Sequence, residues 1–188
     1  IILEIIVYHS HSIIFLLISL PFFAQTEYPK DYFKAPLDIK LHLSGSFGEL
    51  RSNHFHTGLD FKTNQKEGLN VYAAADGYVS RIKISSYGYG KAIYVTHPNG
   101  FTTVYGHLQQ GSGKIQDFII NSHYKDKAFE IELFLKPDEL VVKQGEVIAL
   151  SGNTGGSGGP HLHFEIRDTK SEKPINPLLF GFDALIKD

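Results

Sequence analysis

The sequence of 188 residues contains no cysteine, no methionine and no tryptophan. The lack of cysteine excludes disulfide bonds, thiolate zinc sites, cysteine nucleophiles and an anchor built on a lipid-modified cysteine. The lack of tryptophan argues against a carbohydrate-binding surface of stacked rings, although aromatic residues make up 13% of the chain. Because no methionine stands at position 1 and the last residues show no clear ending, we expect the chain to be part of a longer protein.

The chain also lacks an excess of positive charge. With 18 basic and 20 acidic residues its net charge is -2, so nothing indicates nucleic acid as a partner. The glycine-rich stretch GNTGGSGGP, residues 152–160 with Ser151 before it, does not end in the Lys-Ser/Thr pair of a P-loop, and no helix is expected after it. We therefore expect no nucleotide site there, but a flexible wall that lets an extended substrate approach closely.

The N-terminus has the composition of a targeting segment. SIIFLLISLPFFAQ, residues 12–25, is an apolar run of secretory-signal length that ends near the small residue Ala24, and it is short for a membrane span. Residues 1–20 contain no Lys or Arg, which a missing true start would explain. We predict a signal peptide or N-terminal anchor over residues 1–25 and an exported protein of the periplasm or cell envelope. Only an uncleaved N-terminus would attach it to a membrane.

The remaining pattern is mostly of period two, which is typical of strands. The expected strands are rich in Val, Ile, Tyr, Phe and Thr, and an Asn-Gly pair separates two of them as a hairpin signal. They are GYVSRIKI, KAIYVTH, FTTVYGH, AFEIELFL, ELVVKQGEVIAL and HLHFEI. We predict an all-β fold, an antiparallel sheet domain over residues 46–180, preceded by a lead-in segment (26–45) and followed by a tail (181–188). Residues 109–128 are polar and predict a loop, part of an inserted loop at about 109–139.

Two short motifs contain side chains that could carry chemistry. In a strand, His161, His163 and Glu165 point to one face and their neighbours point to the core. His56 and Asp60 in HTGLD are four residues apart, so an extended segment places them on one face as well. Imidazole and carboxylate are good zinc ligands. Taken alone, each motif could instead be a solvent-facing turn or an exposed sheet edge.

A third motif, VYGHL, contains His107, which strand alternation places on the face of Tyr105, Thr103 and Phe101. A catalytic zinc needs three protein ligands and one open position for water. His56, Asp60 and one histidine of the HLH pair supply three ligands. The two remaining histidines could then move protons and polarise the reacting carbonyl. A closed structural zinc site is the alternative, but such sites often use cysteine.

Four ordered motifs together resemble a known family, the lysostaphin-type or LytM-domain zinc metallopeptidases that cut bacterial peptidoglycan. They are HTGLD, NVYAAADGYV, YGKAIYVTHPNGFTTVYGHL and VKQGEVIALSGNTGGSGGPHLHFEI, and the resemblance covers residues 46 to about 167. It implies a β-sheet domain of the LytM or duplicated hybrid motif type, with one Zn²⁺ on the floor of a groove. It also implies endopeptidase cleavage of peptidoglycan peptides.

The resemblance assigns roles residue by residue. His56, Asp60 and His163 would be the zinc ligands, and His107 and His161 would be the catalytic histidines. Glu165 shares the face of the HLH pair and is expected to orient one imidazole from behind.

The sequence departs from the family pattern in two places. The segment between His107 and Val141 is longer than in compact members, and the tyrosine that some members have shortly before the first ligand is replaced by Phe47 and Phe55. His54 is expected to be a neighbour of the site and not a ligand. Some domains of this family have lost ligands and regulate or bind other cell-wall hydrolases. That alternative predicts a gap at one of the five positions, and none is missing.

Overall fold

A computed structural model of the chain describes residues 27–186. The predicted signal peptide lies outside the described residues. The elements, in chain order, are β1 (Leu43–Gly45), β2 (Leu59–Lys62), β3 (Asn70–Tyr72), β4 (Gly77–Ile84), β5 (Lys91–Thr96), β6 (Phe101–Gly106), β7 (Leu108–Gly111), α1 (Gly113–Asp126), β8 (Ile131–Phe134), β9 (Val141–Val142), β10 (Val147–Ser151), β11 (His161–Asp168) and β12 (Pro174–Ile175), followed by two 3₁₀ helices, η1 (Pro177–Phe180) and η2 (Phe182–Ala184).

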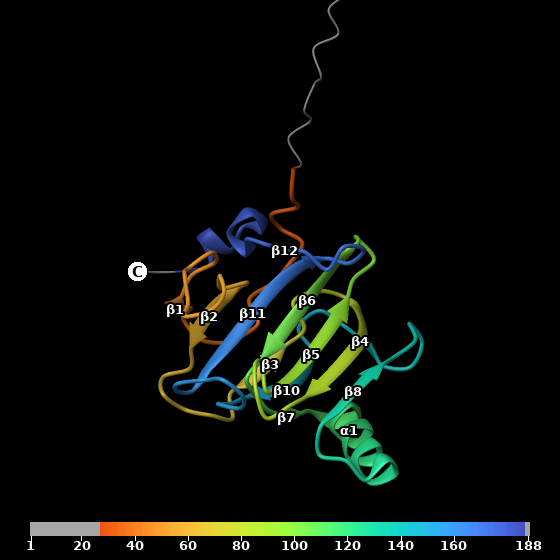
Figure 1. Cartoon of the computed structure of the whole chain (residues 1–188). Coiled ribbons are helices and arrows are strands. Elements are labelled where there is room, and N and C mark those ends of the chain that lie inside the picture. The colour runs from red at the N-terminus through yellow and green to blue at the C-terminus, as the bar shows by residue number, and fades with distance from the viewer. Residues whose placement is uncertain (1–26, 187–188) are drawn as a thin grey trace, which may run out of the picture.

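The strands form two antiparallel sheets (Figure 1). The large sheet runs in the order β1-β2-β11-β6-β5-β4-β8, with β12 paired to β11 and β9 paired to β4. The small sheet has the order β3-β10-β7. The predicted all-β antiparallel fold is therefore confirmed, and the six expected strand segments all contain strands. ELVVKQGEVIAL contains two strands, β9 and β10, because a turn with Gly145 at a φ of 80° separates them.

The main core lies between the two sheets. Leu162, Phe164 and Ile166 of β11 are fully buried there, together with Val71 of β3 and Ile148 of β10. This burial fixes the register of β11, since a shift by one residue would turn its apolar side chains away from the core. The opposite face of β11 is consequently left for His161, His163 and Glu165.

Residues of the expected lead-in and tail contribute to the main core. Phe33, Leu37 and Leu41 of the expected lead-in are each only 3% exposed and belong to the main core, and Phe182 of the expected tail is fully buried. These apolar stretches are short, so their burial depends on the body of the domain against which they pack. The compact unit begins before residue 46 and extends beyond residue 180.

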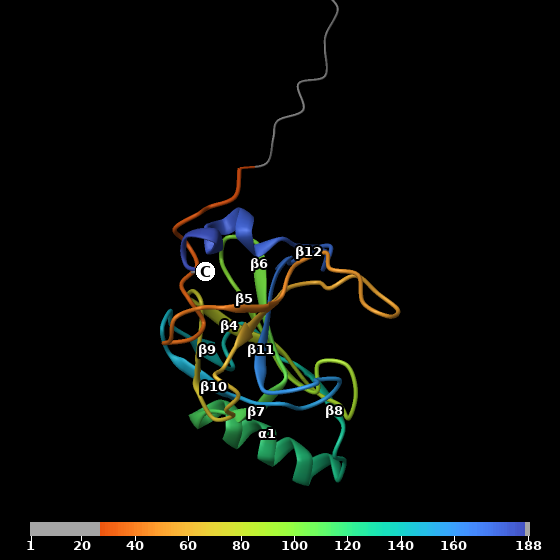
Figure 2. The ribbon, with the colours of Figure 1, turned by 90° about the vertical axis from the view of Figure 1, so that its left-hand side faces the viewer.

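The expectation of a loop over residues 109–128 is wrong. β7 begins at Leu108, and α1 follows it on the outside of the small sheet (Figure 2). The helix buries only Ile115 and Ile119, four residues apart, and its other positions are mostly polar. A stripe of two residues is too narrow to stand out as helical periodicity. Within residues 27–186, no helix has the length and apolar character needed to cross a membrane.

His97 at the β5–β6 hairpin is buried, and it gives the fold a testable pH dependence. Its Nδ1 donates to the carbonyl of Asp76 and its Nε2 contacts Thr103 Oγ1, each at 2.8 Å. Burial lowers the pKa of His97 to about 4. Between that value and about 6.5 the unfolded chain binds the proton and the folded chain does not. Stability is therefore lost as the pH falls through this window, by roughly 3 kcal/mol at most.

We expect His97→Gln to reduce this pH dependence. Urea unfolding at pH 7 and pH 4.5, with a chelator present for both proteins, gives the change in free energy of unfolding for each. The change should be larger for the wild type. Equal changes in the two proteins would show that His97 does not carry the effect.

Candidate metal centre and cleft

The register of the large sheet brings the HLH and HTGLD motifs together. His163 of β11 pairs directly with Asp60 of β2 on one side and with Gly106 of β6 on the other. Directly paired residues of antiparallel strands point to the same face. Asp60 and His163 therefore meet on the face opposite the core, although 103 residues separate them in the chain.

His56 reaches the same place from the segment that precedes β2. Gly58 lies between the two motif residues, and a Cβ there would come within 2.3 Å of the carbonyl oxygen of Phe164. A glycine is thus required for this segment to pass against β11. Once it does, the His56 ring lies 4.9 Å from the His163 ring, centroid to centroid.

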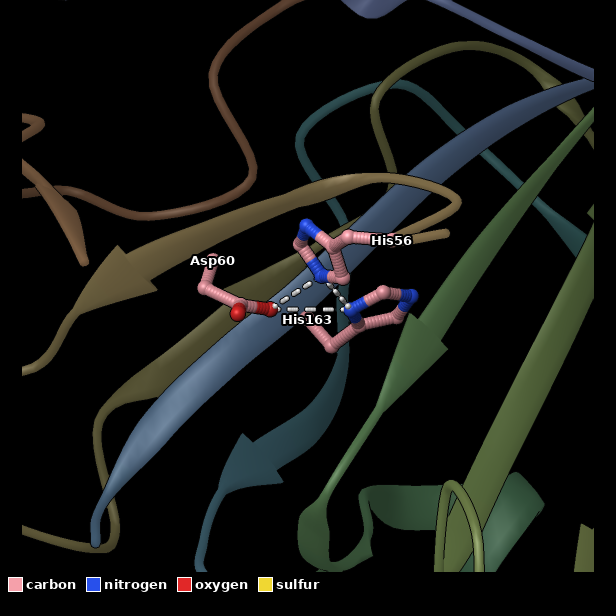
Figure 3. A group of neighbouring side chains, drawn as sticks. All are labelled: His56, Asp60 and His163. Atoms are coloured by element: carbon pink, nitrogen blue, oxygen red, sulfur yellow. Dashed lines mark hydrogen bonds and ion pairs between the residues drawn. The ribbon is translucent and has the colours of Figure 1, made fainter. Parts of the chain in front are cut away.

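Three ligand atoms converge in this cluster (Figure 3). His56 Nε2 lies 3.0 Å from Asp60 Oδ1 and 3.0 Å from His163 Nδ1, and the last two atoms are 2.9 Å apart. Neighbouring ligand atoms in a tetrahedral zinc centre are separated by roughly 3.3 Å, given bonds of about 2.0–2.1 Å. The spacing of the three atoms therefore fits a small divalent cation.

The hydrogen bonds behind the two rings support the same reading. His56 Nδ1 donates to the carbonyl of Ser46 at 2.8 Å, and His163 Nε2 donates to Glu165 Oε1 at 2.8 Å. In neutral imidazoles this leaves lone pairs on the two nitrogens that face Asp60. Three electron-pair donors that point at one another are unfavourable without a positive charge among them, so the donor set is suited to a metal ion.

Electrostatics in the cluster favour positive charge. Burial raises the pKa of Asp60, but hydrogen bonds with His161, His163 and His56 outweigh burial and hold it well below its ordinary value. Burial lowers the pKa of His163, but its bonds to Asp60 and Glu165 raise it overall. Two carboxylates thus stabilise a cation at this position, whether a proton or a metal supplies the charge.

Glu165 is fully buried behind His163 and saturated with donors. Its Oε1 accepts from His163 Nε2, from the Tyr89 hydroxyl at 2.5 Å and from Thr57 Oγ1 at 2.5 Å. Its Oε2 accepts from Arg167 Nε at 2.5 Å. Burial raises the pKa of Glu165, but these partners outweigh burial and lower it. The expected position of Glu165 behind an imidazole agrees with these contacts, and the imidazole is that of His163.

Tyr89 belongs to this network and was not predicted. Its ring stacks on the His163 ring at a centroid distance of 4.9 Å and an interplanar angle of 24°. Burial, together with the neighbouring charge of Glu165, raises the pKa of the Tyr89 phenol. Tyr89 lies in the β4–β5 loop, 33 residues after the first ligand, so no local motif links it to the site. The only sequence signal was its position between Gly88 and Gly90.

Arg51 was also missed. Its Nη2 donates to Asp60 Oδ2 at 3.1 Å and to Glu49 Oε2 at 3.0 Å. A Cβ at position 45 would lie 2.3 Å from Asp60 Oδ2 and 2.4 Å from Arg51 Nη2, so a larger residue there would require this pair to shift. Arg51 holds the second oxygen of Asp60 and leaves Oδ1 to the cluster.

The predicted orientation of His107 is wrong. Tyr105 is fully buried in the main core, and regular alternation would send His107 to the same side. His107 instead has a φ of 58°, in the left-handed region, and follows the end of β6. This backbone conformation is uncommon for a residue with a side chain and clusters at functional sites. It turns the ring towards the cluster, 4.6 Å from the His161 ring and 5.8 Å from the His163 ring, centroid to centroid.

The two remaining histidines have fixed orientations as well. His107 Nδ1 donates to the carbonyl of Thr154, and His161 Nδ1 donates to the carbonyl of Gly159, each at 2.8 Å. The Nε2 atoms are thereby left to face other groups, and His161 Nε2 lies 3.5 Å from Asp60 Oδ1. Burial lowers the pKa of His107 to about 4, so its ring is neutral at pH 7.

The cluster lies at the bottom of a cleft with a volume of about 410 Å³. One wall is the hairpin of residues 46–57, which projects from the body of the molecule (Figure 2). The other walls come from the β4–β5 loop and the glycine-rich loop before β11. These two loops touch each other, since Gly156 N donates to the carbonyl of Gly88 at 2.8 Å. His54 lines this cleft but does not belong to the cluster.

The sequence of the chain matches the model of peptidase family M23 over residues 54–122 and 131–177. The chain belongs to peptidase family M23. This membership confirms the resemblance to the lysostaphin-type peptidases. The matched residues include the three residues of the cluster and the two neighbouring histidines, His107 and His161.

Relatives of this M23 chain include named peptidases. It is 35% identical to the DD-carboxypeptidase/endopeptidase Mpg of Neisseria meningitidis, over 69% of this chain and 23% of that protein. It is 29% identical to the peptidoglycan DD-endopeptidase ShyC of Vibrio cholerae, over 72% of this chain and 27% of that protein. The chain thus spans about a quarter of the length of these relatives.

A solved structure shares the fold. It is a zinc-containing peptidase from Vibrio cholerae, with a TM-score of 0.55 and 25% identity over 82% of this chain and 40% of that one. The M23 chain therefore has the mostly antiparallel β architecture of a known peptidase.

Proposed function

We propose that this M23 chain is a zinc-dependent endopeptidase that hydrolyses peptide bonds in peptidoglycan stem peptides or cross-links. The observation that carries the proposal is the convergence of His56 Nε2, Asp60 Oδ1 and His163 Nδ1 within 3.0 Å of one another in an open cleft. Membership of family M23 and the two peptidase relatives support it.

In this proposal His56, Asp60 and His163 hold one zinc ion. When bound, zinc supplies a Lewis acid and lowers the pKa of a bound water to about 7. Three protein ligands and an open cleft match a catalytic site, whereas a structural site is usually closed by a fourth protein ligand. Glu165 and Arg51 keep the ligand atoms in place from behind.

His107 and His161 act on the substrate from the same side. Each ring has its Nδ1 fixed by a backbone carbonyl, so each presents Nε2 to the cleft. A neutral Nε2 can accept a proton from the attacking water and later donate it to the leaving amine. A protonated Nε2 can donate a hydrogen bond to the oxyanion that develops on the scissile carbonyl. The two histidines divide these two tasks.

Cleavage of peptidoglycan requires the catalytic domain to act outside the cytoplasm. Both relatives reported above are named for DD-peptidase activity, and one of them for peptidoglycan. We therefore propose that the chain is exported and acts in the periplasm or cell envelope.

Digestion of purified peptidoglycan tests the activity. Residues 27–188 are incubated with the polymer, with and without a zinc chelator, and the products are analysed by mass spectrometry. New peptide termini that disappear with the chelator are expected, and their masses identify the bond. Absence of new termini from the zinc-loaded protein would contradict the proposal and favour a binding or regulatory module.

Glu165→Gln should weaken zinc binding about 10–100-fold, since the carboxylate that orients His163 becomes a neutral amide. The matched variant Tyr89→Phe keeps the ring on His163 and removes one donor to Glu165, so we expect a smaller loss. Competition with a chelator of known affinity measures both, on protein shown to be folded. Unchanged zinc affinity in Glu165→Gln would contradict a positioning role for this carboxylate.

A further inference from the structure

We propose that Arg51 binds a carboxylate group on the residue that leaves after cleavage, so that the cleft selects substrates with a free carboxylate beside the scissile bond. This inference rests on the proposed endopeptidase function and specifies its substrate class. Arg51 Nη2 lies 3.1 Å from Asp60 Oδ2, and the other oxygen of Asp60 belongs to the metal-ligating cluster. Only one carboxylate therefore separates the guanidinium from the reacting centre.

Arg51 is the only lysine or arginine among the described residues that line the cleft. Its guanidinium stays charged at any working pH, and its side chain is 36% exposed. The carboxylate of Asp60 is shared with the histidine cluster and does not cancel this charge fully. A peptide that enters the cleft thus meets one permanent positive charge, next to the metal-ligating atoms.

The guanidinium already holds one exchangeable carboxylate. Arg51 Nη2 donates to Glu49 Oε2 at 3.0 Å, and the Glu49 side chain is 48% exposed. Both residues belong to the projecting hairpin. An exposed ion pair of this kind contributes little stability, so a substrate carboxylate can replace Glu49 at small cost.

The position of the guanidinium is built into the fold and is not a chance surface contact. Arg51 and Asp60 pack against Gly45 of β1, and a side chain there would require both groups to move. The hairpin itself is closed by backbone bonds, from Gly48 N to the carbonyl of His56 and from His56 N to the carbonyl of Glu49. The same hairpin therefore places a metal ligand and the arginine together.

The substrate chemistry fits this arrangement. A DD-peptidase cleaves a bond between two D-centres, and the nitrogen that leaves is attached to a carbon that carries a free carboxylate. That carboxylate lies two bonds from the scissile nitrogen, so it must sit beside the metal when the bond is cut. A guanidinium next to the cluster can form charge-assisted hydrogen bonds with it.

Two cross-linked peptides that differ in one group test the inference. In one the leaving residue has its free carboxylate, and in the other that carboxylate is a primary amide. For the wild type we expect kcat/KM to be about tenfold or more higher with the carboxylate. Arg51→Gln should bring the ratio close to one, whatever its effect on absolute activity. Arg51→Lys should retain part of the preference, because lysine keeps the positive charge but lacks the planar guanidinium that can bind both oxygens of a carboxylate.

Glu49→Gln is the matched variant for Arg51→Gln, since the Glu49 side chain contacts Arg51 but none of the metal-ligating atoms. It should lower KM for the carboxylate substrate a few-fold and leave the amide substrate unchanged. The zinc content of every variant is measured, so that a loss of metal is separated from a loss of selectivity. A wild type without preference, or an Arg51→Gln variant that keeps the preference, would overturn the inference.

Binding measurements keep this test separate from the proposed function. Calorimetry with the zinc-loaded protein compares the affinities of the carboxylate and amide peptides directly. If neither peptide is cleaved but the carboxylate peptide binds about tenfold more tightly in an Arg51-dependent manner, the endopeptidase proposal fails and the recognition stands. Equal affinities for both peptides would contradict the recognition whether or not cleavage occurs.

Discussion

Alanine in place of His163 is expected to remove bound zinc and peptide cleavage together. His163 Nδ1 lies 3.0 Å from His56 Nε2 and 2.9 Å from Asp60 Oδ1, and the residue is only 2% exposed. Without it, two ligands remain, which are too few for a zinc centre with three protein ligands. We expect the zinc content to fall from one per chain to near zero and the rate of cleavage to fall by about a thousandfold or more. His56→Ala and Asp60→Ala should behave alike.

His54→Ala is the control for this result. His54 lines the same cleft, two residues before a ligand, but does not belong to the cluster. The His54→Ala variant should keep one zinc per chain and most of the cleavage activity. Zinc is measured by elemental analysis and cleavage by release of soluble peptides from peptidoglycan. Retention of both zinc and activity in His163→Ala would contradict the ligand assignment.

His107→Ala separates the chemistry from metal binding. No atom of His107 belongs to the metal-ligating cluster, and its Nδ1 is bonded to the Thr154 carbonyl. The variant should therefore keep its zinc. It loses the Nε2 that handles a proton or the oxyanion, and such a loss costs about 10²–10⁴-fold in rate. We expect kcat to carry most of the decrease.

His161→Ala gives the companion measurement. Its Nε2 lies 3.5 Å from Asp60 Oδ1, so a modest weakening of zinc binding is expected beside the loss of rate. The pH profiles of the two variants should lose different limbs if one histidine accepts the proton and the other stabilises the oxyanion. Normal cleavage by His107→Ala would exclude the role proposed for it.

Much of the candidate site could be predicted from the sequence, because strand alternation is local. The pattern HLHFEI alone places His161, His163 and Glu165 on the face opposite the core, and the structure has them there. The spacing of His56 and Asp60 could be read in the same way. Their proximity to His163 could not be predicted from local sequence, since it depends on the pairing of β2 with β11 across about one hundred residues.

The failures have physical causes as well. Arg51 and Tyr89 act through contacts with strand residues, Asp60 of β2 for the first and His163 and Glu165 of β11 for the second. Nothing in their local sequence indicates these partners. The orientation of His107 follows from a positive φ that no alternation rule includes. The helix α1 escaped prediction because only Ile115 and Ile119 are buried on it. A positive backbone angle, a tertiary contact and a buried stripe of two residues are features that hydrophobic periodicity does not reveal.

Stepwise return of zinc to chelated protein tests the central claim most directly. Peptidoglycan cleavage is followed as zinc is added in fractions of one equivalent, for the wild type and for Asp60→Ala. The account predicts that wild-type activity rises linearly and reaches its plateau at one zinc per chain, and that Asp60→Ala stays inactive throughout. Full activity in the chelated wild type, or recovery of activity in Asp60→Ala at one equivalent, would contradict a catalytic zinc held by His56, Asp60 and His163.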